Sequence, residues 1–73
     1  MPNLQGRTYK KQMLVMDPQA LKDVLTANFL RAGQDFYSPS AEQVIRDHLQ
    51  RYKGIGPVTA GAIYMRAVNG TIK

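Results

Sequence analysis

Apolar side chains recur at helical spacing in a segment before the middle of the chain. Between positions 17 and 33 they form one stripe, made of Ala20, Leu21, Val24, Leu25 and Phe29. Residues three and four positions apart share one face of a helix, so this stripe predicts an amphipathic helix that packs on a core. Asp17 is a suitable N-cap, Pro18 a suitable first helical residue, and Gly33 a suitable C-terminal cap. We therefore expect a scaffold helix here.

Two further helical stretches flank a glycine-rich turn. Apolar or aromatic residues within 41–52 are Val44, Ile45, Leu49 and Tyr52, and those within 58–68 include Ala62, Ile63 and Val68. The first of these helices has two alternative starts, Ser38 followed by Pro39, or Ser40 with Gln43 in a capping box. In the turn, glycine permits the positive φ that a tight connection needs, and Pro57 suits a helix start. Together, the stretches predict an all-α fold of three short helices.

The turn carries a motif of moderate specificity. Gly54-Ile55-Gly56-Pro57-Val58-Thr59-Ala60, followed by Ile63, resembles the helix-hairpin-helix motif. The resemblance implies a non-sequence-specific grip on a phosphate backbone through hairpin N–H groups and the start of the second helix. The candidate phosphate-binding residues are Lys53, Gly54, Ile55, Gly56, Thr59 and Arg66, with Arg46 and Arg51 as further cations of a basic rim. DNA-binding members often carry Lys or Arg where this chain has Val58, and a turn that only joins two packed helices has the same pattern.

Residues 1–16 show no helical periodicity and contain Pro2 and Gly6. We expect a flexible or strand-like arm here, followed by a small helical domain over residues 17–73. The arm combines positive charge, an aromatic ring and an apolar end, which suits a contact element. The candidate partner-binding residues are Arg7, Tyr9, Lys10, Lys11, Met13 and Leu14, together with Phe36 from the loop over residues 34–39. In the alternative interpretation, Leu14 and Met16 only cover the helical core.

Charge and composition narrow the function classes. Ten Lys and Arg against five Asp and Glu give a net charge of +5 in 73 residues. This favours acidic partners, either nucleic acid or an acidic protein surface, although the charge can also serve solubility alone. The chain has no cysteine, which suits a reducing cytoplasm, and no apolar run approaches the ~20 residues of a membrane span.

Catalytic and metal-binding patterns are missing from the sequence. His48 is the single histidine, the five acidic residues are scattered, and no nucleophile, base and acid stand at a known spacing. Asp47 beside His48 does not make a pair, because adjacent residues of a helix point in different directions. We therefore expect a binding protein without enzymatic activity, cofactor or metal.

The chain as a whole, from Met1-Pro2-Asn3-Leu4-Gln5-Gly6 to Gly70-Thr71-Ile72-Lys73, also resembles a family of small phage-encoded regulators of bacterial RNA polymerase. The resemblance implies a protein of the host cytoplasm that docks near the RNA exit channel, on the amino-terminal region of the β′ subunit and on the β flap. It also implies inhibition of initiation by displacement of the σ factor, and antitermination on the elongating enzyme. We expect a monomer that binds the polymerase, with nascent RNA or DNA as further candidate partners and no membrane. A DNA-binding helix-hairpin-helix module is the alternative.

Overall fold

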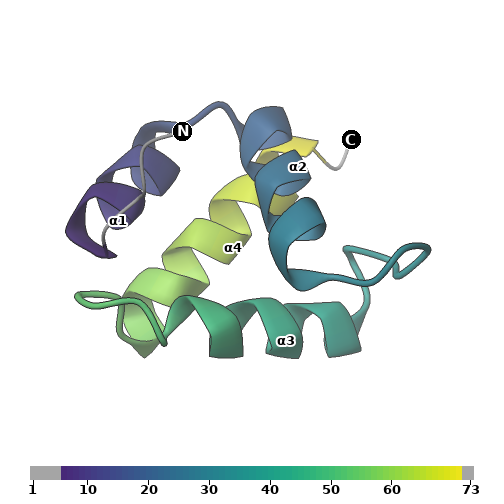
Figure 1. Ribbon diagram of the computed structural model, residues 1–73. Coiled ribbons are helices and arrows are strands. Elements are labelled where there is room, and N and C mark those ends of the chain that lie inside the picture. The colour runs from purple at the N-terminus through teal and green to yellow at the C-terminus, as the bar shows by residue number, and fades with distance from the viewer. Residues whose placement is uncertain (1–5, 72–73) are drawn as a thin grey trace.

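The computed structural model describes residues 6–71, and the side chains of residues 11–71. This part of the chain is helical without strands, which confirms the all-α class. Its elements are α1 (Gly6–Val15), α2 (Pro18–Phe29), α3 (Pro39–Leu49) and α4 (Pro57–Thr71). Figure 1 shows α4 in the middle of the fold, where it packs against α1, α2 and α3.

The start of α2 follows the sequence closely. The carboxylate of Asp17 accepts hydrogen bonds from the backbone N–H groups of Gln19 and Ala20, at 3.1 and 3.4 Å. The end of the helix differs from the prediction, because Leu30 has extended backbone angles (φ −107°, ψ 156°) and the helix ends at Phe29. Gly33, expected as the helix cap, uses its positive φ of 83° in the following loop instead.

The first of the two predicted starts is the one used by α3. The Ser38 hydroxyl accepts from the N–H of Ala41 at 3.2 Å, and Pro39 is the first helical residue. The same hydroxyl donates to the carbonyl of Asp35 at 2.8 Å, which secures the end of the preceding loop.

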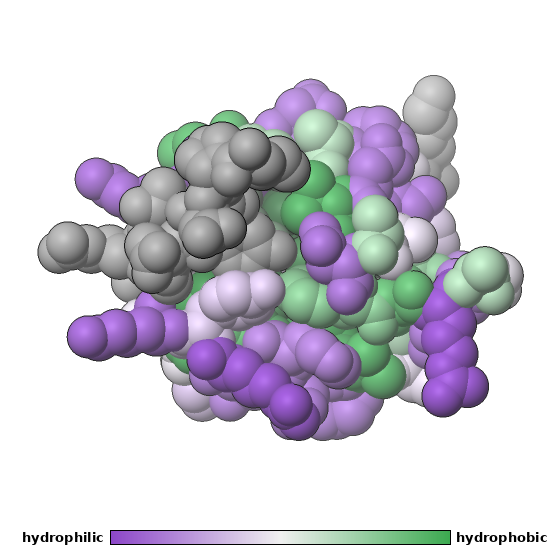
Figure 2. Space-filling view, in the orientation of Figure 1, coloured by the Kyte–Doolittle hydropathy of each residue, from purple (hydrophilic) through white to green (hydrophobic). Residues whose placement is uncertain are grey.

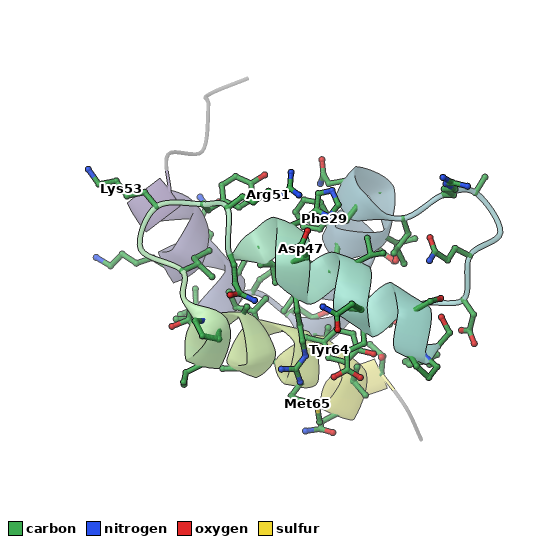
Figure 3. The ribbon with its side chains drawn as sticks, turned by 90° about the horizontal axis from the view of Figure 1, so that it is seen from below. Phe29, Asp47, Arg51, Lys53, Tyr64 and Met65 are labelled. Atoms are coloured by element: carbon green, nitrogen blue, oxygen red, sulfur yellow. The ribbon has the colours of Figure 1, made fainter. Side chains whose placement is uncertain are left out.

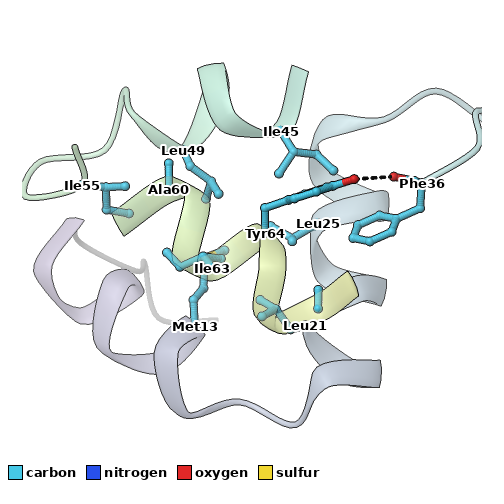
Figure 4. Close-up of a cluster of buried hydrophobic side chains, with 11 residues drawn as sticks. Met13, Leu21, Leu25, Phe36, Ile45, Leu49, Ile55, Ala60, Ile63 and Tyr64 are labelled. Carbon is cyan, nitrogen blue, oxygen red and sulfur yellow. Dashed lines mark hydrogen bonds between the residues drawn. The ribbon is translucent and has the colours of Figure 1, made fainter. Parts of the chain in front are cut away.

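The core lies where α1, α2 and α3 face α4. The largest fully buried side chains are Met13, Leu21, Leu25, Ile45, Leu49 and Ile63. Figure 4 shows these side chains converging from all four helices. At one end, the Phe36 and Tyr64 rings stack with centroids 5.6 Å apart, and the Tyr64 hydroxyl donates to the Phe36 carbonyl at 3.4 Å. Burial of these side chains is the main stabilising contribution to the fold.

The expectation of a strand-like arm over residues 1–16 is wrong, because residues 6–15 form the helix α1. Met13 is completely buried and points toward Ile63 of α4 (Figure 4). Because Met13 is the one completely buried side chain of the described part of α1, the segment shows no apolar stripe in the sequence. Contact with α4 supplies the tertiary packing that stabilises so short a helix. Residues 1–5 of the predicted arm lie outside the described residues. The division into a flexible arm over residues 1–16 and a helical domain over residues 17–73 stays a prediction.

Candidate binding surfaces

The turn between α3 and α4 is a tightly bonded loop around a buried isoleucine. The N–H of Ile55 donates to the carbonyl of Tyr52 at 3.1 Å, and the N–H of Ala60 donates to the carbonyl of Gly56 at 2.9 Å. Gly54 has a φ of 88°, which a side chain would strain, and Ile55 is only 4% exposed. The structure thus places Ile55 as the expected plug between the two helices.

The start of α4 differs from the starts of α2 and α3. Asp17 and Ser38 cap those helices with side-chain oxygens, whereas the residue before Pro57 is Gly56, which has no side chain. The first N–H groups of a helix have no partner within the helix. Those of α4 therefore face the exposed end of the loop, where an anion would find donors and the positive end of the helix dipole.

Only part of the predicted phosphate-binding set comes together at this loop. Lys53 is exposed at the tip and points away from the domain (Figure 3), and Thr59 is half-buried in the first turn of α4. Arg66 lies elsewhere, because its Nε donates to the carbonyl of Met16 at 2.8 Å and ties α4 to the link between α1 and α2. The residue after the proline, Val58, is 85% exposed.

The positive charge of the predicted basic rim around the hairpin is largely neutralised by two ion pairs on and just after α3. Arg46 Nε lies 2.9 Å from Glu42 Oε2, and Arg51 Nη2 lies 3.1 Å from Asp47 Oδ2. Both are exposed or half-exposed pairs one helical turn apart, so each contributes little to stability but reduces the local positive potential. Within residues 11–71, Lys53 is the cation of this region that has no carboxylate partner.

The predicted partner-binding set is also divided by the structure. Met13 is completely buried and Phe36 is 4% exposed, so both belong to the core and cannot anchor a partner without unfolding. On the same helix as Met13, Leu14 is 37% and Val15 78% exposed, and Lys11 is exposed as well. The side chains of Arg7, Tyr9 and Lys10 lie outside the described residues.

A surface hollow that the sequence analysis did not anticipate lies between α2 and α3. It has a volume of about 610 Å³ and is lined by Phe29, by residues 31–34 of the loop, and by Val44 and His48. The Phe29 and His48 rings stack with centroids 5.2 Å apart and an angle of 28° between their planes. No periodicity connects residues of two helices and a loop, so the sequence held no signal for this grouping.

The histidine in this hollow has a defined orientation. Its Nδ1 lies 2.8 Å from the carbonyl oxygen of Val44, and because a carbonyl only accepts, Nδ1 carries the hydrogen. The other ring nitrogen, Nε2, is left for contacts outside the helix. Within the described residues, no three His, Asp or Glu side chains are grouped as metal ligands require.

The hydroxyl group of Tyr64 lies in the core next to charged side chains of α3. The pKa of the Tyr64 hydroxyl is raised above its usual value of 10.0, first by burial and then by the nearby carboxylate of Glu42. The Arg46 guanidinium, 5.8 Å from the Tyr64 ring centroid, acts in the opposite direction. The tyrosine thus remains neutral at any physiological pH.

Within residues 6–71, none of the helices combines the length and apolar character that a membrane crossing requires. Comparison with protein-family models, with curated protein sequences and with solved structures finds no match to this chain.

Proposed function

We propose that this protein is a non-catalytic regulator of bacterial RNA polymerase, as the family resemblance of the whole chain implies. In this proposal it docks near the RNA exit channel, on the amino-terminal region of β′ and on the β flap. It inhibits initiation by displacing the σ factor and promotes antitermination on the elongating enzyme. The identity of the partner comes from the resemblance, and the mode of binding is argued from the geometry.

The outer face of α1 is the surface that best fits docking on a protein partner. Met13 holds this helix to the core, while Leu14 and Val15 remain exposed next to the exposed cation Lys11. Apolar side chains framed by charge on a fixed element are typical of the centre of a protein interface. Val15 is the more exposed of the two apolar side chains, at 78%.

The unpaired positive charges of the domain also favour an acidic protein as the partner. Within residues 11–71, Lys11, Arg31 and Lys53 have no carboxylate partner, whereas Arg46 and Arg51 are paired. Figure 2 shows hydrophilic side chains bordering a face where apolar ones also reach the surface. Such a surface attracts an acidic protein at long range and holds it through apolar contact.

A pull-down tests the proposal. Tagged full-length protein is expected to retain bacterial core RNA polymerase after nuclease treatment, and Val15→Glu is expected to reduce this retention about tenfold or more. Val58→Glu is the matched control, because it makes the same change at an exposed valine outside α1. Both variants are first compared with the wild type by thermal unfolding. Failure of the wild-type protein to retain polymerase at physiological salt would overturn the proposal.

A functional assay then separates docking from regulation. Purified protein is added to promoter-dependent transcription and to elongation through an intrinsic terminator. We expect loss of σ from the holoenzyme and increased readthrough, both weakened by Val15→Glu. Unchanged σ retention and unchanged termination, with polymerase bound, would restrict the function to binding.

A second candidate function is the helix-hairpin-helix grip on a phosphate backbone. The specific observation in its favour is the side-chain-free start of α4 at Gly56, next to the exposed Lys53. Gly56→Asp tests it, because the carboxylate would cap α4 and occupy the anion position at the same time. An added Cβ meets no atom within 4 Å there, so the fold is retained. Salt-sensitive binding of duplex DNA that Gly56→Asp abolishes would favour this function, and unchanged binding would exclude the hairpin.

A further inference from the structure

We propose that the hollow between α2 and α3 is a docking site for a short acidic segment of a protein partner. A large apolar or aromatic side chain of that segment enters the hollow, and a neighbouring carboxylate pairs with Arg31. The inference rests on the proposed function and deepens it, because it assigns a second contact surface, separate from α1, to the same kind of partner.

The apolar part of the site is the ring stack and the residues around it. Phe29 and His48 are half-buried, with centroids 5.2 Å apart, and Val44 lies in the turn of α3 before His48. Figure 3 shows Phe29 in the region where α2 and α3 meet. A concave surface of about 610 Å³ with an aromatic wall accommodates one large side chain, because ring faces and edges offer flat apolar contact.

The permanent charge of the lining is the guanidinium of Arg31. Arg31 and His48 are the ionisable residues of the lining, and no carboxylate belongs to it. Arg31 has no ion-pair partner among residues 11–71. A guanidinium in this position is complementary to a carboxylate, which it can bind through two parallel N–H groups.

The backbone of Arg31 is held by hydrogen bonds, which lowers the entropy cost of ordering its side chain when a partner binds. Its N–H donates to the side-chain oxygen of Gln34 at 3.2 Å, and its carbonyl accepts from the N–H of Gln34 at 3.0 Å. The positive φ of Gly33 makes this short turn possible. The start of the Arg31 side chain is thereby held at the edge of the hollow before any partner binds.

The surroundings favour a carboxylate over a nucleic acid. A phosphate backbone is held by a series of cations. The two arginines on and just after α3, Arg46 and Arg51, are already paired with carboxylates, at 2.9 and 3.1 Å. One carboxylate next to one apolar side chain requires only the one guanidinium that the site provides.

Titration of the isotope-labelled full chain with the peptide acetyl-Asp-Phe-Asp-amide, followed by NMR, tests the proposal. We expect saturable shifts at the amides of residues 31–34, 44 and 48. Arg31→Glu and Ala32→Glu place a carboxylate in or at the hollow, and each is expected to weaken binding about tenfold or more. Ala32 is exposed in the loop, so this variant retains the fold. Lys53→Glu, which makes the same charge reversal at the hairpin, is the matched control and should bind as the wild type does.

Three results would overturn the proposal: no saturable shift at the hollow, binding by Arg31→Glu equal to that of the wild type, or displacement of the peptide by an equimolar trithymidylate. Parallel pull-downs distinguish this failure from failure of the proposed function. Polymerase retained equally by wild type and Arg31→Glu would refute the docking site and leave the regulator proposal intact. Peptide binding at the hollow without polymerase retention would support the docking site and refute the named partner.

Discussion

Arg66 and Met16 are joined by a hydrogen bond across 50 positions of the chain, in which the guanidinium Nε donates to the carbonyl oxygen at 2.8 Å. Met16 lies in the link between α1 and α2, and Arg66 lies in the middle of α4. The bond satisfies a backbone carbonyl just after the last residue of α1, where the carbonyl groups have no N–H donors within the helix. It also removes Arg66 from the group of cations available at the hairpin.

Arg66→Met should therefore reduce stability without affecting a phosphate grip. The apolar stem is retained while the charged hydrogen bond is lost, so we expect the free energy of unfolding to fall by about 1–2 kcal/mol. Urea unfolding followed by circular dichroism measures this change. Lys53→Met, which removes an exposed cation without a described partner, is the control and should leave stability within about 0.5 kcal/mol of the wild type. Equal stability of the two variants would contradict the structural role of Arg66.

Two glycines of α4 should respond in opposite ways to alanine. A Cβ at Gly70 would overlap the ring of Pro18, which a rigid ring at the start of α2 cannot avoid, whereas a Cβ at Gly61 meets only the flexible end of Arg46, at 2.9 Å. We expect Gly70→Ala to destabilise by about 1–3 kcal/mol through overpacking. Gly61→Ala should stabilise by up to about 1 kcal/mol, because alanine favours the helix. Thermal unfolding of the two variants decides this, and a stabilised Gly70→Ala would show that α2 and α4 are not in close contact there.

The hydroxyl of Thr26 is buried without a hydrogen-bond partner in the described structure. Replacement by the isosteric valine removes an unsatisfied polar group, so we expect Thr26→Val to stabilise by about 1 kcal/mol. Thr71→Val is the contrasting variant, because the Thr71 hydroxyl lies 2.7 Å from both the Ala67 carbonyl oxygen and the Tyr37 hydroxyl, and its removal should destabilise. Chemical denaturation of both variants measures the two signs. A loss of stability in Thr26→Val would mean that its hydroxyl has a partner in solution.

The buried Tyr64 should make stability fall in alkaline solution. Its pKa is raised above 10.0 in the folded state, so the folded chain holds the proton more tightly than the unfolded chain does. The corresponding stability is fully present below pH 10 and is lost as the pH rises through the raised folded value. The difference in unfolding free energy between the wild type and Tyr64→Phe, which keeps the ring, should be constant up to about pH 9.5 and then change in favour of the variant. A difference that stays constant to pH 12 would contradict the raised pKa.

Local sequence signals were sufficient to predict most of the helix starts and the turn between α3 and α4. Pro18 after Asp17, and Pro39 after Ser38, mark helix starts because they act through bonds within a few residues. Gly54 and Pro57 mark the turn for the same reason, and Ile55 is buried as its position between two helices implies. The end of α2 was misplaced because Gly33 could serve equally as a helix cap or as a loop residue, and packing of the loop selects the second role.

The residues of the candidate binding surfaces could not be predicted from local sequence patterns, because their exposure depends on contacts between distant segments. Met13 and Phe36 resemble exposed anchors in the sequence, but Ile63 and Tyr64 of α4 bury them. Arg66 resembles a hairpin cation until its partner, 50 positions earlier, is known. The exposure of Val15 and the hollow at Phe29 and His48 are likewise visible only once the helices are packed.

The amino-acid sequence by itself determined the helical class, three of the four helix positions and the hairpin, because caps, prolines and apolar spacing act over one or two turns. Tertiary structure decided that residues 6–15 form a helix, which side chains of that segment stay exposed, and which cations remain without a partner. These properties depend on contacts between residues tens of positions apart, and the free energy of such contacts exists only after the chain has folded around α4.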